Sequence, residues 1–359
     1  MLSLGLGSWL SRRFEGVLVD KRSCDACRIL LVLLAFVWLQ STTAWAQDRR
    51  GAAVAAPSAA DWSVPRTAWG APDLQGVWDY RTMTPLERPR EFGNKTTLTA
   101  EEAAAYEQEQ GARLDDYDLA PSVHAKWWLD YGREMTDDRR TSLIVDPPDG
   151  RIPATTDAAK QRAAARSDLR QRHGADAAEF RGLGERCLTF GMPRFPGAYN
   201  NNVQIFQTPT HVAIVSEMIH NARLIPLDGR PLLTSDMAQW HGDARGYYEG
   251  DTLVVETTNF SAKSGFRGAT PNLRLAERFT RVAPGTVHYE ITLDDPATWS
   301  DPWTALVPMT KTDQPLYEYA CHEGNYGLGN ILHNARYADD PNYADTLSTS
   351  RDGHEDIDQ

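Results

Sequence analysis

The stretch Arg274–Leu293, RLAERFTRVAPGTVHYEITL, decides the fold of this 359-residue chain. It contains two runs of alternating apolar and polar residues, joined by the turn sequence Ala-Pro-Gly at 283–285. If the second run is a strand, one face carries the apolar side chains of Val287, Tyr289, Ile291 and Leu293. The other face carries His288, Glu290 and Thr292. The stretch therefore predicts an antiparallel β-hairpin with one buried face.

Similar runs fill most of the chain after residue 200, with short turn sequences between them. They predict strands at 203–207, 211–218, 222–227, 246–249, 252–260, 304–309 and 315–321, and a further strand at 74–80. Successive hairpins without helical crossovers are typical of an antiparallel meander rather than a parallel sheet. We therefore expect a mainly β protein of about ten strands, folded as an antiparallel meander β-barrel or as a sandwich.

A helical insertion interrupts this pattern at about 95–185. Thr99 and Glu102 form a capping-box pattern, which predicts a helix that begins there and ends at Gly111. A second helix is expected over 156–173, with a short strand at 141–145 before it. The insertion belongs to the β-rich domain, which we place at 66–338.

Residues 1–46 have the order of regions found in a secretory signal peptide. Basic residues precede the apolar run ILLVLLAFVWL at 29–39, and the small-x-small sequence Ala44-Trp45-Ala46 follows it. The run has 11 residues, too few to span a bilayer comfortably. An uncleaved anchor is the alternative. We expect cleavage after Ala46 and a periplasmic or secreted protein with no membrane insertion after cleavage.

The two ends of the remaining chain differ from its middle in composition. Residues 47–65 are rich in Ala, Pro and Ser and predict a flexible lead-in. Residues 339–359 are acidic and nearly without large apolar side chains, which predicts a disordered tail.

Charge and cysteine content narrow the possible functions. The chain carries 37 basic and 49 acidic side chains, so its net charge of −12 argues against a nucleic-acid partner. Once the signal peptide is removed, only Cys187 and Cys321 remain of the four cysteines. In an oxidising compartment two such cysteines favour a disulfide, which we expect between them.

Two resemblances extend these expectations. Asp73–Trp78, DLQGVW, places a G-x-W sequence on the first strand and resembles the opening strand of lipocalins and other calycin barrels, in which the tryptophan plugs the barrel floor. Longer stretches resemble a large family of exported bacterial proteins, from which no activity carries over; they lie at 70–78, 138–150, 198–202, 248–255 and 319–326. This second resemblance implies export and the extent of the domain.

The candidate site residues come from three polar clusters, because the common phosphate-, nucleotide- and zinc-binding motifs are absent from the sequence. The predicted catalytic residues are His241, Asp243, Arg245, Glu318, His322 and Glu323. The predicted ligand-binding residues are Tyr199, Asn202, His220 and Arg223. We expect the loop with His241 to meet the segment with His322 at one open end of the sheet system.

If the protein is an enzyme, we expect His241 or His322 to act as a general base or metal ligand, since histidine titrates near neutral pH. Asp243 or Glu318 orients the imidazole, and Arg245 holds an anionic group. No metal-ligand spacing supports a metal, so metal and cofactor stay unknown. The alternative is that each histidine makes only a structural hydrogen bond.

Three functions remain open from the sequence. The favoured one is an exported barrel that binds a small apolar or aromatic ligand. The alternative is a periplasmic or secreted hydrolase or lyase, metal-dependent or not, that acts on a glycan or an aromatic compound through a His/carboxylate site. A purely structural envelope protein is the third. Whether the chain is an enzyme, and its oligomeric state, are left open.

The signal-peptide hypothesis makes a direct prediction. N-terminal sequencing of the protein recovered from an exporting host should begin at Gln47, because Ala44 and Ala46 meet the requirement for small residues before the cleaved bond. A mature chain that still carries the apolar run at 29–39 would contradict it.

Overall fold

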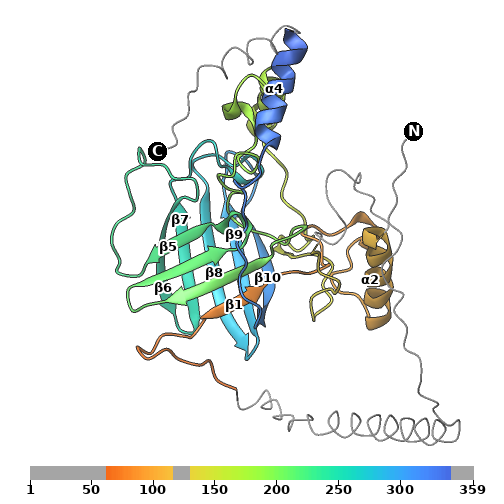
Figure 1. Cartoon of the computed structure of the whole chain (residues 1–359). Coiled ribbons are helices and arrows are strands. Elements are labelled where there is room, and N and C mark those ends of the chain that lie inside the picture. The colour runs from red at the N-terminus through yellow and green to blue at the C-terminus, as the bar shows by residue number, and fades with distance from the viewer. Residues whose placement is uncertain (1–61, 116–129, 341–359) are drawn as a thin grey trace, which may run out of the picture. The chain divides into compact units, whose positions relative to one another are not determined.

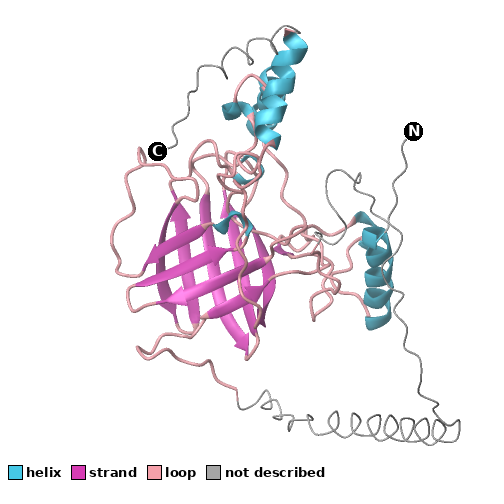
Figure 2. Cartoon of the chain, viewed as in Figure 1, coloured by secondary structure: helices cyan, strands magenta, loops and turns pink. Residues whose placement is uncertain are grey.

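The computed structural model describes residues 62–115 and 130–340. The predicted signal peptide, most of the predicted lead-in and the predicted tail beyond Asp340 lie outside the described residues. The described chain forms strands gathered into one curled sheet, with helices outside it (Figure 1, Figure 2). The mainly β prediction, with ten strands and a helical insertion, is confirmed.

The strands and helices have the following bounds. The strands are β1 (Gly76–Asp79), β2 (Ile144–Asp146), β3 (Asn202–Gln207), β4 (His211–Ser216), β5 (Ala222–Pro226), β6 (Asp243–Glu249), β7 (Thr252–Thr258), β8 (Arg274–Ala283), β9 (Thr286–Asp294) and β10 (Trp303–Thr312). The α-helices are α2 (Ala100–Asp115), α3 (Asp157–His173) and α4 (Gly327–Asp339), and short 3-10 turns occur between them.

The sheet has the order of a meander. Its path is β5-β4-β3-β1-β10-β9-β8-β7-β6, every hydrogen-bonded pair is antiparallel, and β2 pairs separately with β10. Leaving β2 aside, strands that follow one another along the chain are therefore hydrogen-bonded neighbours in the sheet except for β5 and β6, and the first strand lies beside the last. This is the up-and-down order of a barrel rather than two packed sheets.

The two edge strands, β5 and β6, approach each other without forming a ladder. A Cβ atom built on Gly246 of β6 would lie 2.9 Å from Cγ2 of Ile225 in β5, so only glycine allows this approach. With nine strands on the path, the alternating directions bring β5 and β6 together in parallel orientation. The antiparallel meander therefore cannot continue across this seam, and residues 227–242 carry the chain back along it.

We call the end of the sheet where β3, β5 and β6 begin and β4 ends the mouth. At the opposite end, Trp78 is fully buried and its Nε1 donates a 2.8 Å hydrogen bond to the carbonyl oxygen of Leu74. The guanidinium of Arg281 lies 5.8 Å from the centre of the Trp78 ring. The G-x-W tryptophan thus packs beneath a cation next to the β8–β9 turn.

A buried ion pair crosses the interior from one side of the seam to the other. Arg223 of β5 donates two hydrogen bonds to the carboxylate of Glu277 in β8, Nη1–Oε1 at 2.9 Å and Nη2–Oε2 at 2.5 Å. Nη2 also donates to Oγ1 of Thr257 in β7 at 3.3 Å. The hydroxyl of Tyr289 in β9 donates to Glu277 at 2.6 Å. One edge strand is thereby joined to the wall beyond the other edge.

The helices begin as the sequence indicates, but one ends later. Thr99 accepts the backbone N–H of Glu102 at 3.2 Å, and the Glu102 carboxylate accepts that of Thr99 at 2.9 Å, so the capping box is confirmed. The predicted end at Gly111 is wrong, because α2 continues to Asp115. The ion pair Glu109–Arg113 spans the glycine, whose cost inside a helix is only about 1 kcal/mol.

The segment 315–321 is not a strand, which corrects the sequence prediction. Strands β9 and β1 already occupy the two edges of β10, so no free edge is available beside it. In addition, Pro315 has no N–H to donate to a neighbouring strand. The segment instead returns to the mouth, where Cys321 bonds to Cys187 with Cα atoms 5.6 Å apart. The predicted disulfide is therefore confirmed.

Helix α4 follows this disulfide and was not anticipated from the sequence. Its signal is the spacing of Leu328, Ile331 and Leu332, which fits one face of a helix. Of the helices in the described ranges, none is long and apolar enough to cross a membrane.

The buried pair predicts a large difference between two similar substitutions. Glu277→Gln leaves the Arg223 charge uncompensated in the interior and should lower the free energy of unfolding by about 3–5 kcal/mol. The matched control Glu290→Gln removes a half-exposed carboxylate beside Arg278 and should cost less than about 1 kcal/mol. Urea unfolding measures both, and equal small losses would contradict the structural role assigned to the pair.

Candidate functional site

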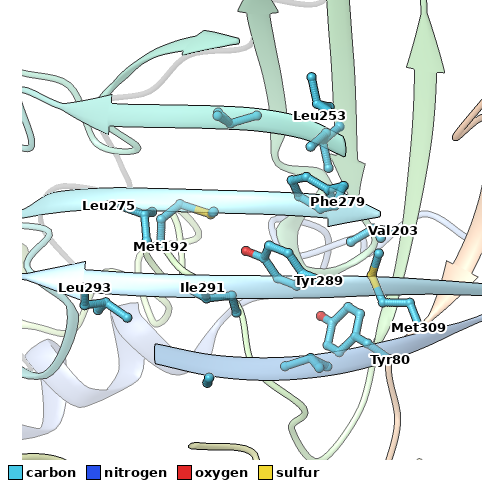
Figure 3. Packing of buried hydrophobic residues seen from close by; sticks show 14 of the residues in the cluster. Tyr80, Met192, Val203, Leu253, Leu275, Phe279, Tyr289, Ile291, Leu293 and Met309 are labelled. Atoms are coloured by element: carbon cyan, nitrogen blue, oxygen red, sulfur yellow. The ribbon is translucent and has the colours of Figure 1, made fainter. Parts of the chain in front are cut away.

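A cavity of about 40 Å³ lies inside the curled sheet, toward the mouth. Its apolar and aromatic lining consists of Met192, Val203, Ile214, Phe279, Tyr289 and Met309. Its polar lining consists of Tyr80, Arg194, Ser216, Asn221, Arg223 and Glu277. Figure 3 shows Phe279, Tyr289 and Tyr80 in a row on the inner side of the sheet. We call this space the lumen cavity.

The lumen cavity has an aromatic wall. The rings of Phe279 and Tyr289, on the paired strands β8 and β9, stack with centroids 4.6 Å apart and an interplanar angle of 12°. Burial raises the pKa of Tyr289 well above its usual value, and the negative charge of Glu277 raises it further. Tyr289 is therefore neutral and donates its hydrogen to Glu277.

Three buried polar atoms at the lumen cavity make no hydrogen bond of normal geometry with the described residues. They are the hydroxyl oxygens of Tyr80 and Ser216 and Nε of Arg194. Burial raises the pKa of Tyr80, the charge of Arg194 and a donated hydrogen bond from it oppose that rise, and the charges of Glu217 and Asp79 add to it. Since buried polar groups in proteins are nearly always satisfied, these three point to something that the cavity takes up.

Two residues of the cavity come from the segment 187–198, which we call the plug. Met192 of the plug is buried in the core, and Phe195 stacks on Trp303 with ring centroids 6.2 Å apart. The disulfide fixes the start of the plug at Cys187. Arg194 therefore reaches the lumen cavity from a segment that is held at both of its sides.

His241 holds the plug from the other side of the mouth. The Oγ1 of Thr189 accepts N–H groups of Gly191 at 2.8 Å and Asn221 at 3.1 Å, and lies 2.6 Å from Nε2 of His241. With both acceptor positions used, the threonine hydroxyl donates its hydrogen to Nε2, so the imidazole proton is on Nδ1. Burial, and then the charge of Arg223, lower the pKa of His241 to about 4. The ring is neutral at pH 7.

Asp243 and Arg245 hold the loop that returns along the seam. Asp243 accepts the backbone N–H of Leu233 at 2.7 Å and pairs with Arg245 at 2.6 Å. Arg245 also donates to the carbonyl oxygens of Arg230 at 3.0 Å and Pro231 at 2.6 Å. Their observed contacts therefore fasten the 227–242 loop to β6.

The remaining predicted residues, apart from Arg223 in the interior, lie at the mouth. Glu318, Glu323 and Tyr199 line an open pocket of about 970 Å³ together with Tyr319, whose ring is parallel to that of Tyr199. The other three lie as follows: Nδ1 of His220 is 3.1 Å from the carbonyl oxygen of Tyr319, Asn202 donates to Glu217 at 2.8 Å, and His322 is exposed beside Cys321.

Apart from Arg223, the predicted residues lie toward one end of the sheet, but they do not share one set of contacts. The disulfide and the Thr189–His241 bond bring the segment with His322 and the loop with His241 to the same end. No group of three or more metal-ligating side chains occurs within residues 62–115 and 130–340. The catalytic roles of the six residues stay predictions.

Sequence analysis missed the residues that form the lumen cavity, except for Arg223. A signal was present, because Glu277 occupies the inward phase of β8 between Leu275 and Phe279. A charged residue in the apolar phase of an alternating strand indicates a buried charge that needs a partner. Tyr80, Arg194 and Ser216 gave no such signal, since each lies at an element end or in a loop.

Comparisons with known proteins identify no family for this chain. No protein-family model matches the chain, and no curated protein matches it. Among solved structures, a crystal structure of a mutant of the fluorescent protein UnaG is 13% identical over 38% of this chain and 98% of that chain, with a TM-score of 0.22. A TM-score this low does not establish a shared fold, so the fold rests on the strand order described above.

The neutral His241 predicts a pH-dependent stability. Its pKa is lower in the folded state than the 6.5 of an unfolded histidine, so the unfolded chain binds more protons between these values. Stability should fall as the pH is lowered from about 6.5 to about 4, by up to about 3 kcal/mol. Burial also lowers the pKa of His288. His288 and the carboxylates of the chain therefore add their own pH dependence to the stability.

The control is His241→Gln, which keeps an acceptor for Thr189 but does not titrate. The difference in unfolding free energy between the natural protein and this variant should be largest at pH 7 and shrink toward pH 4, because the contributions of His288 and the carboxylates are common to both. Urea unfolding at several pH values measures it. A difference that does not change with pH would show that His241 has an ordinary pKa.

Proposed function

We propose that this protein binds a small apolar or aromatic molecule in the lumen cavity, within a barrel of the lipocalin or calycin type. The observation that carries the proposal is an interior cavity with an aromatic wall on one side and unsatisfied polar groups on the other. Small-molecule sites in proteins commonly combine an apolar lining with a few placed polar groups. The up-and-down order and the buried Trp78 support the barrel type.

The lining can adapt to a ligand larger than the present cavity. Met192 and Met309 lie on it, and methionine side chains rearrange easily because they are unbranched and have three rotatable bonds. An aromatic ligand placed beside Phe279 and Tyr289 would extend an existing stack of rings. The volume of about 40 Å³ then describes the site before these side chains move.

The protein works, on this proposal, in the periplasm or outside the cell. A disulfide that joins residues 134 positions apart supports an oxidising compartment. The alternative of a hydrolase or lyase has less support, because Asp243 and Arg245 are engaged with the 227–242 loop and Nε2 of His241 with Thr189.

A cavity-filling substitution tests the proposal. Toluene and indole should bind the purified chain 47–359, and Val203→Phe should weaken both at least about tenfold, because the added ring occupies the cavity. The matched control is Val282→Phe, a partly exposed position on β8, which should change affinity less than about twofold. Saturation-transfer NMR and calorimetry measure binding, and circular dichroism confirms folding.

Two results would contradict the proposal. One is the absence of toluene and indole binding to the natural chain. The other is equal affinity for the natural chain and for a folded Val203→Phe variant, which would place binding outside the lumen cavity.

A further inference from the structure

The lumen cavity contains more hydrogen-bond donors and positive charge than its own side chains can satisfy. Its charged side chains are Arg194, Arg223 and Glu277. Arg223 and Glu277 neutralise each other through two hydrogen bonds. Arg194 forms no ion pair with any residue in the described ranges, and its guanidinium lies 5.6 Å from the centre of the Phe190 ring. Of the charged side chains that line the cavity, Arg194 is therefore the one without an ion-pair partner.

Two hydroxyl groups share this excess of donors. Tyr80 and Ser216 are 3% and 7% exposed, and neither hydroxyl has an acceptor for its hydrogen in the part of the chain that the structure describes. The guanidinium of Arg194 lies beside the Tyr80 oxygen and can only donate to it. Three donors from three different segments of the chain thus lack an acceptor at the same cavity.

A neighbouring carboxylate, that of Glu217, has its hydrogen bonds outside the lumen cavity, although its charge still acts on Tyr80. Glu217 is buried next to Ser216, but its Oε2 accepts the side-chain amide of Asn202 at 2.8 Å and the backbone N–H of Asn202 at 3.3 Å. Glu217 lines the open pocket at the mouth and not the lumen cavity. His241 adds no charge, because it is neutral at pH 7. No carboxylate that lines the lumen cavity therefore pairs with Arg194, whose side chain is partly exposed and reaches the cavity from the plug.

We propose that the ligand of the lumen cavity carries a carboxylate, which pairs with Arg194 and accepts hydrogen bonds from Tyr80 and Ser216. This inference rests on the proposed ligand-binding function and specifies its chemistry. A carboxylate supplies two oxygens with about four acceptor positions and one negative charge, which matches three donors and one cation. It is also small enough for a cavity of about 40 Å³, whereas the apolar body of the ligand lies against Phe279 and Tyr289.

The plug determines where this carboxylate binds. Arg194 is the one donor that does not come from the sheet or its immediate flanks, and the disulfide and the Thr189–His241 bond fix the plug on which it lies. Cys187 and His241 are thus positioning residues for Arg194. An arginine held in this way loses little freedom when the ligand arrives, which favours binding.

The experiment compares benzoate with its neutral counterpart benzamide, by calorimetry at pH 7, on the natural chain and three variants. Benzoate should bind the natural chain at least about tenfold more tightly than benzamide, because only benzoate is charged. Arg194→Gln should remove this preference and leave benzamide affinity within about twofold. Arg194→Lys, which keeps the charge but not the planar donor fork, should retain part of the preference.

The matched control is Arg274→Gln, which removes one positive charge from an exposed position of β8. It should leave the preference for benzoate unchanged. A second readout needs no ligand: Arg194→Met should raise the melting temperature of the empty protein, since it removes the buried Nε donor and a charge without an ion-pair partner.

The outcomes separate this inference from the proposed function. If benzamide binds as tightly as benzoate, or if Arg194→Gln weakens both equally, the carboxylate inference is overturned while lumen binding stands. If benzoate does not bind, the inference is overturned, and toluene binding decides whether the proposed function fails with it. A benzoate preference that Arg274→Gln abolishes would also overturn it.

Discussion

The buried pair of Arg223 and Glu277 is the constraint on which this structure depends. The ladder of hydrogen bonds does not close between β5 and β6, so side chains must hold the two edges together. Arg223 does so by reaching from β5 to Thr257 in β7 and Glu277 in β8. Desolvating two charges is costly, and the geometry offsets that cost with a bidentate contact and a further bond from Tyr289. The same contact forms one wall of the lumen cavity.

The sequence predicts the meander well because each strand has its own local signal. Alternation with a period of two and turn sequences identify β8 and β9 without knowledge of the rest. The seam between β5 and β6 has no such signal. Their parallel orientation follows from the odd number of strands on the path, which is a property of the whole sheet. Segment 315–321 shows the same limit: its pattern resembles a strand, but β1 and β9 occupy both edges of β10. Whether an edge is free depends on the whole sheet.

The sequence predicts that polar residues gather at one end of the sheet, but it does not predict the contacts that they make. Polar residues at strand ends and loops do gather at the mouth, as strand order requires. Their partners come from distant segments, and no spacing reveals that Asp243 and Arg245 bind the 227–242 loop. The interior polar residues are harder still to predict, because a polar side chain is assigned to the surface unless its position in the inward–outward alternation of its strand is considered. Glu277 is the example for which phase alone was sufficient.

The role of His241 shows how packing changes the meaning of a residue. From the sequence, histidine suggests a group that titrates near neutral pH, hence a base. In the structure, burial and the charge of Arg223 keep it neutral, and its Nε2 accepts the hydroxyl of Thr189. That bond and the disulfide fix the two ends of one short stretch, Cys187 and Thr189, from which the chain runs to Arg194. The histidine and the cysteines therefore act on the interior through the plug. The disposition of donors around the lumen cavity depends on contacts made outside it.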